Sequence, residues 1–284
     1  MEKHLLLTVS DDTSCLYGAR FVSTFFRMKS SLHLTLFYVA PPSSSPGAGR
    51  LPGTAPWSPK VSTSTLNLAE QALSGARDIL CARGFSEEQV RTKLTVRSMG
   101  TVKDIIREAR KGFYDAVILG RRGYALFENL LSSSMSRQIL DHPIDFPVWI
   151  CRQINPDRRH VLLCTDGSEP SLRMADHVGY MLNEDPDHRI ILLHVAPHRA
   201  AGESEILETA EKMLLEHRLP PERIEKRLAV ARNVSEAILA EAKTENCAVV
   251  AVGRGGTGGK GWLSGSCSSR LLKELDEGAL WVSR

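Results

Sequence analysis

Short apolar runs alternate with amphipathic segments along the whole chain. The first apolar run, residues 5–9, is typical of a buried strand, and residues 15–28 follow it with apolar side chains at helical spacing. The alternation predicts strands at 5–9, 32–39, 90–97, 114–119, 147–151, 160–165, 189–195, 223–230, 247–252 and 279–282. It predicts helices at 15–28, 66–83, 101–111, 132–141, 170–182, 203–217 and 234–244, and one that begins at Ser266.

The second half of the pattern repeats the first at a spacing of about 155 residues. The segment VLLCTDGSEPSL, from residue 161, aligns with LLLTVSDDTSCL, from residue 5. AVVAVGRGG (from 248) aligns with AVILGRRG (from 116), and GALWVSR (from 278) with FPVWICR (from 146). Alternating strands and helices favour parallel sheets covered by helices on both faces. We therefore predict an α/β fold with two repeated open parallel-sheet domains, residues 1–154 and 155–284.

Residues 41–64 interrupt the first domain with a segment rich in Pro, Ser and Gly that shows no periodicity. Such composition predicts a loop. A passive flexible insertion is the simplest interpretation, and a phosphorylation target or a partner site is the alternative.

Composition limits the classes of partner. The net charge of +3 and the lack of a long basic run give no indication of nucleic-acid binding, and no stretch is apolar enough to span a bilayer. The N-terminal segment resembles a first strand rather than a signal peptide. The six cysteines form no CxxC pair, which favours free thiols and a cytoplasmic location.

A glycine-rich segment after residue 252 is the strongest candidate for ligand binding. Its glycines allow close approach of the backbone, and the following Gly265-Ser266-Cys267-Ser268 opens a helix whose free N–H groups suit phosphate. Two common phosphate loops are excluded. Only about 25 residues follow Gly258, too few for a dinucleotide-binding unit. The segment is not a Walker A loop, because Arg254 stands where the first Gly of that motif is required.

The repeat and this loop together resemble the universal stress protein family in its tandem two-domain form. The family motif is Gly-x2-Gly-x9-Gly-Ser/Thr after the fourth strand, supported here by Asp166-Gly167-Ser168 after the first strand of the second half. The resemblance implies five-stranded, Rossmann-like domains. It also implies pairing of the two fifth strands, so that the domains pack as a pseudo-dimer. Trp149 and Trp281 would lie at that junction, with packing inside each domain as the alternative.

The resemblance implies a stress-response protein that binds an adenine nucleotide, ATP or else ADP or AMP, with Mg²⁺ possible beside it. The second domain is expected to hold it. The site residues expected there are Thr165, Asp166, Val195, Val252, Gly253, Gly256, Gly265, Ser266, Cys267 and Ser268. In this chain only eight residues separate Gly256 from Gly265, one fewer than in the motif.

The first domain departs further from the motif. Gly120 and Gly123 are kept, but Ser133-Ser134 stands where Gly-Ser is expected. Ser10 replaces the aspartate, and Glu128 places a negative charge in the loop. A nucleotide site in this half is therefore a weaker expectation.

Simpler structural roles stand beside these assignments. Asp166 suits a turn or a helix cap, the glycine run a flexible surface loop, and Ser266 and Ser268 helix capping. His194 and His198 do not share a helical face, so a metal pair is not expected.

No general base, metal triad or nucleophile is evident, so a binding or regulatory role is expected rather than catalysis. The alternatives are a nucleotide-independent protein-interaction scaffold and a slow ATP hydrolase. An unknown protein partner and a homodimer are compatible with each.

Overall fold

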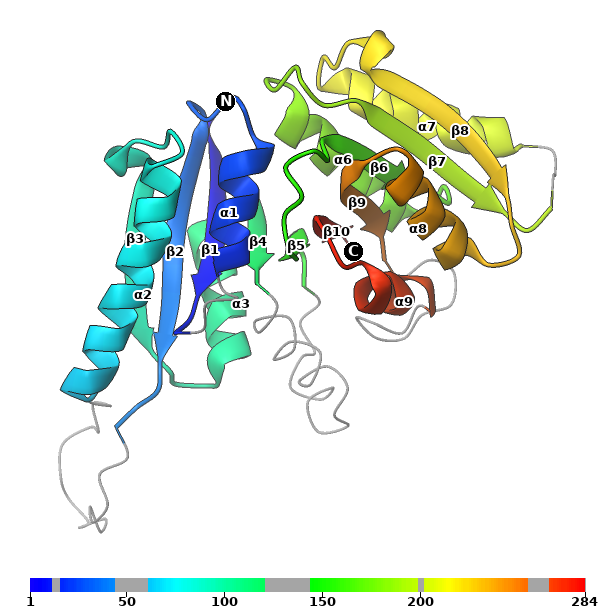
Figure 1. Cartoon of the computed structure of the whole chain (residues 1–284). Coiled ribbons are helices and arrows are strands. Elements are labelled where there is room, and N and C mark those ends of the chain that lie inside the picture. Colours follow the sequence, from blue (N-terminus) through cyan, green and yellow to red (C-terminus); the bar gives the residue numbers. More distant parts are fainter. Residues whose placement is uncertain (12–15, 44–60, 121–143, 199–201, 255–265, 284) are drawn as a thin grey trace.

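The computed structural model describes residues 1–11, 16–43, 61–120, 144–198, 202–254 and 266–283 (Figure 1). The first half contains β1 (Lys3–Val9), α1 (Leu16–Phe25), β2 (Leu32–Ala40), α2 (Thr63–Cys81), η2 (Glu87–Gln89), β3 (Val90–Val96), α3 (Thr101–Gly112), β4 (Ala116–Leu119) and β5 (Val148–Cys151). The second half contains β6 (His160–Cys164), α6 (Glu169–Leu182), β7 (Ile190–Ala196), α7 (Glu203–Glu216), η3 (Pro221–Arg223), β8 (Ile224–Val230), α8 (Val234–Thr244), β9 (Cys247–Gly253), α9 (Ser266–Glu274) and β10 (Ala279–Ser283).

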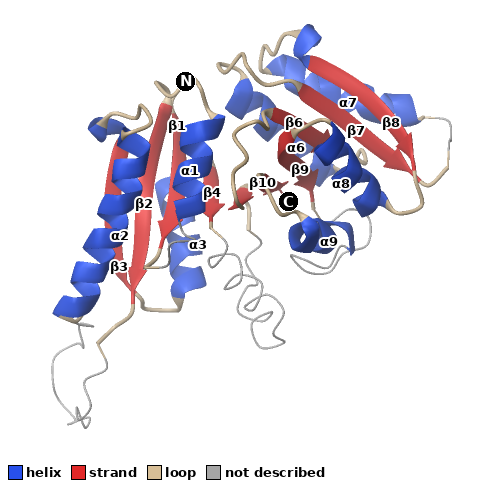
Figure 2. Cartoon of the chain, viewed as in Figure 1, coloured by secondary structure: helices blue, strands red, loops and turns tan. Residues whose placement is uncertain are grey.

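All ten of these strands form one sheet, in the order β3-β2-β1-β4-β5-β10-β9-β6-β7-β8 (Figure 2). Within each half the strands are parallel, and the two halves have the same order. The halves join where β5 and β10 pair antiparallel. The predicted α/β fold, with two repeated parallel-sheet units arranged as a pseudo-dimer, is therefore confirmed.

Helices cover both faces of this sheet, as the near-continuous apolar strands require. Leu5 and Leu7 of β1 belong to the hydrophobic cluster that also contains residues of α1, α2, α6 and α7. Leu6 belongs to the cluster on the opposite face, with residues of α3, α8 and α9. Among the described helices, none has the length and apolar character needed to cross a membrane.

The predicted elements that the structure describes begin and end within three residues of their expected positions. The loop predicted at 41–64 extends two residues too far, because α2 begins at Thr63. The side chain of Ser62 accepts a hydrogen bond from the N–H of Thr65 at 3.2 Å and caps the helix earlier than its apolar periodicity indicated. Residues 44–60 and the helix expected at 132–141 lie outside the described residues. The short 3₁₀ turns η2 and η3 were not predicted.

Two stacked tryptophans lie at the centre of the sheet. Trp149 of β5 and Trp281 of β10 face each other in the antiparallel register. Their ring centroids are 4.0 Å apart with an interplanar angle of 3°, and both side chains are fully buried. Phe26 stacks on Trp149, and Phe25 meets Trp281 edge-on. The placement of both tryptophans at the junction of the halves is confirmed.

The repeat is not symmetric around these rings. The Nε1–H of Trp149 donates to Nε2 of His177 at 3.0 Å, whereas Nε1 of Trp281 is buried without a partner among the described residues. The repeat alignment places Phe21 of α1 over His177 of α6. The residue of the first half that corresponds to His177 therefore has no ring nitrogen that could accept a hydrogen bond.

Polar contacts also cross the junction. Lys3 of β1 is 2 % exposed, and its Nζ donates to Oδ1 of Asn183 at 2.9 Å. The main-chain N–H of Arg27 donates to Oδ2 of Asp185 at 2.7 Å. Burial lowers the pKa of Lys3, and the nearby Glu184 carboxylate opposes that shift. These contacts tie the first half to the loop that follows α6.

We expect Trp281→Ala to lower the free energy of unfolding by about 3–5 kcal/mol, because it removes a fully buried ring and its stacking partner's contacts. Urea denaturation followed by circular dichroism measures the change. Phe113→Ala is the control, since that ring is 90 % exposed and its loss is expected to cost less than about 0.5 kcal/mol. Equal effects of the two substitutions would contradict the central role of the tryptophan pair.

His177 predicts a pH dependence of stability. Burial, together with the charge of His217, lowers the pKa of His177 to about 3. In the unfolded chain the histidine protonates near pH 6.5. The stability that the neutral, buried His177 contributes is therefore fully present above pH 6.5 and is lost as the pH falls towards 3. The loss approaches about 1.4 kcal/mol per pH unit at the steepest part of this window.

We expect His177→Gln to show a shallower fall in stability between pH 6 and pH 4 than the unmodified chain. Glutamine keeps an acceptor for Trp149 but does not titrate. Thermal unfolding across this range checks the difference, with His4→Gln at a half-exposed site as the control. An unchanged slope would show that His177 is accessible to protons.

Candidate functional site

A pocket in the second half opens where β6, β7 and β9 end, at the carboxyl edge of the parallel strands. Open α/β sheets generally bind ligands at this edge. The lining includes six residues that the sequence predicted as site residues: Thr165, Asp166, Val195, Val252, Gly253 and Cys267. These residues come from the ends of three strands, the turn after β6 and the first turn of α9.

The turn after β6 is fixed by a short chain of hydrogen bonds. Oγ of Ser171 donates to the carbonyl oxygen of Ser168 at 2.8 Å. The Thr165 hydroxyl lies 3.1 Å from the Ser171 hydroxyl and accepts from the N–H of Gly167 at 3.2 Å. Since Ser171 donates elsewhere, Thr165 is the donor of the pair. Gly167 has a φ of 76°, a conformation that favours glycine.

Asp166 lies in this turn with its carboxylate held as an anion. Its Oδ1 accepts from the N–H of Ser168 at 3.0 Å and from the hydroxyl of the same residue at 2.5 Å. Burial alone would raise the pKa of Asp166, but these hydrogen bonds outweigh it and lower the pKa. The turn-forming role considered for Asp166 is therefore present, and the same residue also lines the pocket.

Gly253 is required by packing. A Cβ built at this position would lie 2.1 Å from the main-chain nitrogen of Ser171 and 2.3 Å from its Cα. The end of β9 therefore passes directly against the first turn of α6. Oγ of Ser283 at the end of β10 donates to the carbonyl oxygen of Pro170 at 2.7 Å and holds the same turn. Only glycine allows this approach of strand and helix.

The helix α9 begins at Ser266 and presents its first turn to the pocket. Burial raises the pKa of the Cys267 thiol, and the Asp166 carboxylate adds to that shift. Burial also raises the pKa of Cys164 well above its usual value. Ser268 is buried in the same turn. Both pocket thiols are therefore neutral near pH 7, and the main-chain N–H groups of the first turn are the groups suited to an anion.

The rest of the lining is mostly apolar, and sequence reasoning missed several of its members: Cys164, Ser171, Leu193, Val234 and Ile238. Val234 and Ile238 lie four residues apart on one face of α8. Their helical spacing was a usable signal, but only the fold shows that this face meets the ends of β6 and β7. Apolar walls with a few polar groups at one side suit a flat, partly polar ligand.

The structure describes only some of the remaining predicted site residues. Gly120 is buried at the end of β4, the equivalent position in the first half. The main chain of Ser266 starts α9. The predicted residues Gly123, Ser133, Ser134, Gly256 and Gly265 lie outside the described residues.

Metal binding has no support in the described part of the chain, where no group of three or more His, Cys, Asp or Glu side chains is arranged to hold an ion. Nδ1 of His194 lies 2.8 Å from the carbonyl oxygen of Thr165 and donates to it. This buried histidine stabilises the strand end beside the pocket.

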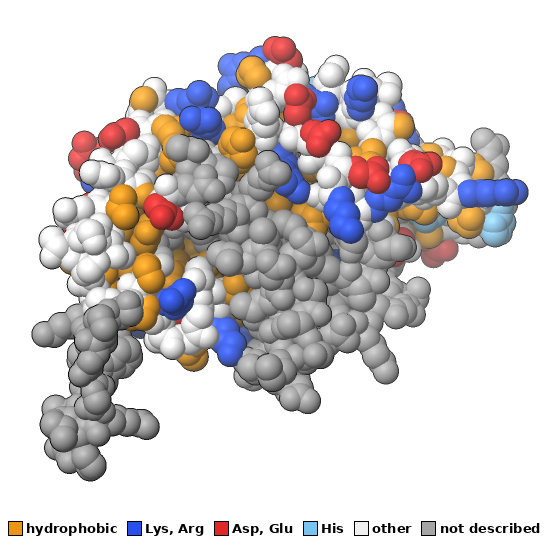
Figure 3. All heavy atoms as spheres, turned by 60° about the horizontal axis from the view of Figure 1, so that its bottom comes forward, with side chains coloured by type: hydrophobic (Ala, Val, Ile, Leu, Met, Phe, Trp, Pro, Cys, Tyr) orange, Lys and Arg blue, Asp and Glu red, His pale blue; other side chains and the backbone are white. Residues whose placement is uncertain are grey.

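In the view from the side where the strands of the first half end, described acidic and basic side chains lie interspersed (Figure 3).

Comparison with known proteins points to one family. The model of the universal stress protein family matches the chain twice, over residues 1–152 and 157–277. The two matches coincide with the two halves of the sheet. Among curated proteins, none matches the chain.

Solved structures share the fold. A universal stress protein from Archaeoglobus fulgidus DSM 4304 matches with a TM-score of 0.64 and 17% identity, over 99% of this chain and 96% of that one. A putative universal stress protein from Pseudomonas aeruginosa UCBPP-PA14 matches with a TM-score of 0.54 and 15% identity, over 99% and 93%. A universal stress protein in complex with cAMP matches 45% of this chain and 98% of its own, with 20% identity. Its TM-score of 0.38 carries no argument about the present chain.

We expect Gly253→Ala to lower the free energy of unfolding by about 2 kcal/mol or more, because the new methyl group meets main-chain atoms that cannot rotate away. Urea denaturation measures the change. Gly75→Ala is the matched control: it lies within α2 with no atom within 4 Å of the added Cβ. That control is expected to gain up to about 1 kcal/mol. A tolerated Gly253→Ala would show that β9 and α6 separate easily.

Proposed function

This chain belongs to the universal stress protein family, and on that premise we propose that it is a stress-response binding protein that holds an adenine nucleotide in its second half. The observation that carries the proposal is the convergence of six predicted site residues on one pocket at the carboxyl edge of the sheet. They come from separate segments of the chain, so their meeting is a property of the fold.

Each side of the pocket suits one part of such a ligand. Apolar side chains such as Val195, Val252 and Ile238 offer a slot for a purine ring. The Asp166 carboxylate is an acceptor for ribose hydroxyls. The first turn of α9 offers main-chain N–H groups to phosphate oxygens. We propose ATP as the nucleotide, with Gly256, Gly265, Ser266 and Ser268 completing the phosphate side and Mg²⁺ bound through the phosphates.

Binding suits the described pocket better than catalysis does. The thiols of Cys164 and Cys267 have raised pKa values and are poor nucleophiles near pH 7. The lowered pKa of Asp166 makes it a weak base. We therefore propose a regulatory role in which the nucleotide is held. The five cysteines of the described residues are all free thiols, in keeping with our proposal of a cytoplasmic setting.

A nucleotide-independent scaffold is the second candidate, and Gly253 favours it. The packing of β9 on α6 is enough to require that glycine, so its presence does not demand a ligand. The two functions differ in one measurable respect. A scaffold with degenerate sites shows no change in melting temperature with ATP, ADP or AMP, whereas a nucleotide-binding protein is stabilised by the ligand it prefers.

We expect Asp166→Ala to weaken ATP binding at least tenfold, because the ribose loses its charged acceptor and the turn after β6 loses two hydrogen bonds. Isothermal titration calorimetry with Mg-ATP measures the dissociation constant. The melting temperature of the unliganded variant shows whether the fold is intact.

The matched control is Asp11→Ala, which removes an exposed carboxylate from the corresponding turn of the first half. It is expected to leave the affinity unchanged. Weaker binding in Asp11→Ala with normal binding in Asp166→Ala would move the nucleotide to the first half and contradict the proposal.

A further inference from the structure

Another pocket, of about 390 Å³, lies in the first half between α1, the turn after α2 and the linker that joins the two halves. This volume falls within the range of ligand-binding pockets. None of its lining residues lines the proposed nucleotide pocket. The lining includes Tyr17, Arg20, Thr24, Arg83, Gln153 and Ile154.

The repeat identifies the matching positions of the second half. Aligning residue 161 with residue 5 places Asp176 over Arg20 and Tyr180 over Thr24. In both halves these positions lie on the first helix, α1 or α6. One face of α1 lines the pocket in the first half, and the equivalent face of α6 lines a pocket between the halves.

The turns after α2 and α7 match equally well. The N–H of Arg83 and the N–H of His217 each donate to the carbonyl oxygen three residues earlier, at 3.1 Å and 3.2 Å. The next residue has a positive φ in both turns, 97° for Gly84 and 62° for Arg218. Arg83 and His217 therefore occupy equivalent positions, and each lines the respective pocket.

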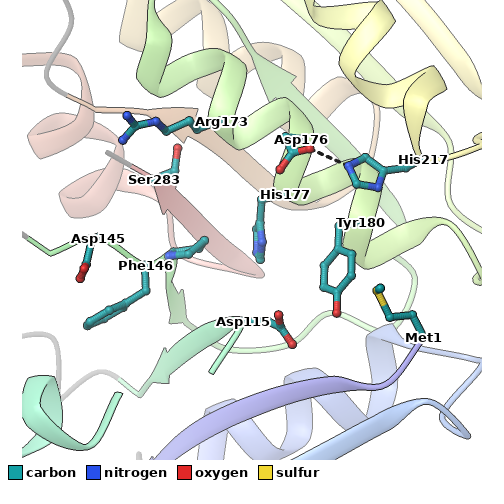
Figure 4. A pocket seen from close by; sticks show the side chains of 11 residues that line it. Met1, Asp115, Asp145, Phe146, Arg173, Asp176, His177, Tyr180, His217 and Ser283 are labelled. Atoms are coloured by element: carbon teal, nitrogen blue, oxygen red, sulfur yellow. Dashed lines mark hydrogen bonds and ion pairs between the residues drawn. The ribbon is translucent and has the colours of Figure 1, made fainter. Parts of the chain in front are cut away.

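In the second half, the two matching positions hold an acid and a base that pair with each other. Nε2 of His217 donates to Oδ1 of Asp176 at 2.7 Å (Figure 4). Both side chains line the pocket between the halves, together with Asp115, His177 and Tyr180. The polar groups at these two positions therefore satisfy each other within the chain.

In the first half, both matching positions hold arginine, which stays protonated in proteins. Both side chains are exposed. The guanidinium of Arg83 donates from Nη1 to Oγ1 of Thr24 at 2.5 Å, and its other N–H groups have no partner among the described residues. The side chain of Arg20 forms no ion pair or hydrogen bond within the same part of the chain. Two like charges on one pocket repel each other, so a bridging anion from outside the chain would stabilise them.

Glu277 is the acidic residue that meets the linker, and it is already paired. Nε of Arg158 lies 3.1 Å from its Oε2, and Nδ2 of Asn155 donates to the same oxygen at 3.2 Å. Among the described residues, the lining of the first-half pocket contains no Asp or Glu. This lining therefore carries a net positive charge.

Lys29 adds a third positive charge close to Arg83. Burial lowers the pKa of Lys29, the Asp185 carboxylate opposes that shift, and the charges of Arg27 and Arg83 add to it. Nζ of Lys29 lies 5.9 Å from the ring centroid of Phe85, just after the turn that contains Arg83. The charge of Arg83 thus acts on a neighbouring cation, as expected of a guanidinium that no carboxylate neutralises.

The other groups of the pocket suit an organic ligand. Tyr17 and Ile154 pack against the hydrophobic core, which fixes their positions. The N–H of Gly278 donates to the carbonyl oxygen of Gln153 at 2.8 Å and holds the linker in place. Gln153 also brings a side-chain amide, an uncharged donor, to the lining. Apolar surface beside cationic groups favours an anion with a carbon skeleton over a bare ion.

A phosphate group fits two arginines better than a carboxylate does. Each guanidinium offers a planar fork of N–H donors that matches either group. A phosphate monoester carries a charge of about −1.5 to −2 at pH 7 and three acceptor oxygens, enough for two forks. A carboxylate carries a single charge and only two oxygens.

We propose that the first-half pocket binds a small organic phosphate monoester. Arg20 and Arg83 bind the phosphate group, and the side-chain amide of Gln153 donates to one of its oxygens. The organic part of the ligand packs against Tyr17 and Ile154. The ligand supplies from outside the chain the negative charge that Asp176 supplies in the second half.

Phenyl phosphate is the probe, because it joins an apolar ring to a phosphate monoester. Isothermal titration calorimetry with the full chain, in the presence of excess Mg-ATP, is expected to give saturable binding. Inorganic phosphate, which lacks the ring, and phenol, which lacks the charge, are each expected to bind at least tenfold more weakly.

The double variant Arg20→Gln/Arg83→Gln is expected to weaken the binding of phenyl phosphate at least tenfold, because it removes both charged donors. The matched control is Arg91→Gln/Arg97→Gln, which removes two exposed arginines, one within β3 and one just after it. This control makes the same change in net charge and is expected to leave the affinity unchanged.

Arg20→Asp copies the second half, where Asp176 stands at this position. The new carboxylate is expected to pair with Arg83 and abolish the binding of phenyl phosphate, with an equal or higher melting temperature. No saturable binding to the unmodified chain, equal weakening by both double variants, or displacement of phenyl phosphate by Mg-ATP would overturn the proposal. Inorganic phosphate that binds as tightly as phenyl phosphate would overturn the assignment of an organic ligand.

Discussion

The antiparallel pairing of β5 with β10, with Trp149 stacked on Trp281, is the constraint on which the rest of the structure depends. Each half alone would end in an open strand with a large aromatic side chain beside it. Such an edge exposes unpaired main-chain groups and apolar surface to water. Pairing the two edges within one chain removes both costs and makes a single ten-stranded sheet.

This junction sets the positions of both pockets. It fixes α6 against the first half, and the same helix begins at the proposed nucleotide pocket and lines the pocket between the halves further along. Its first turn is held by Gly253 and Ser283, and its later residues include His177 beneath the tryptophans. The two pockets are thus separate in their lining but share one helix.

Periodicity predicted the strands and most of the helices, because apolar spacing directly reflects which face is buried, and the repeat predicted two similar halves. They also placed Trp149 and Trp281, since the two residues occupy the same position of the repeat. The sequence did not reveal why Gly253 is glycine: the atoms it must avoid belong to α6, more than eighty residues earlier. The start of α2 was misjudged because a side-chain cap at Ser62 outweighed apolar spacing. The asymmetry of His177 and Phe21 could be seen only once both were found against the tryptophans.

One working nucleotide site in each chain is the central requirement of the proposed function. Native mass spectrometry of the purified chain with Mg-ATP counts bound nucleotides without assuming which half holds them. One adenine nucleotide per chain at saturation is the predicted result, with the pocket of the second half as its site. No bound nucleotide at millimolar ATP, or two per chain, would contradict the account.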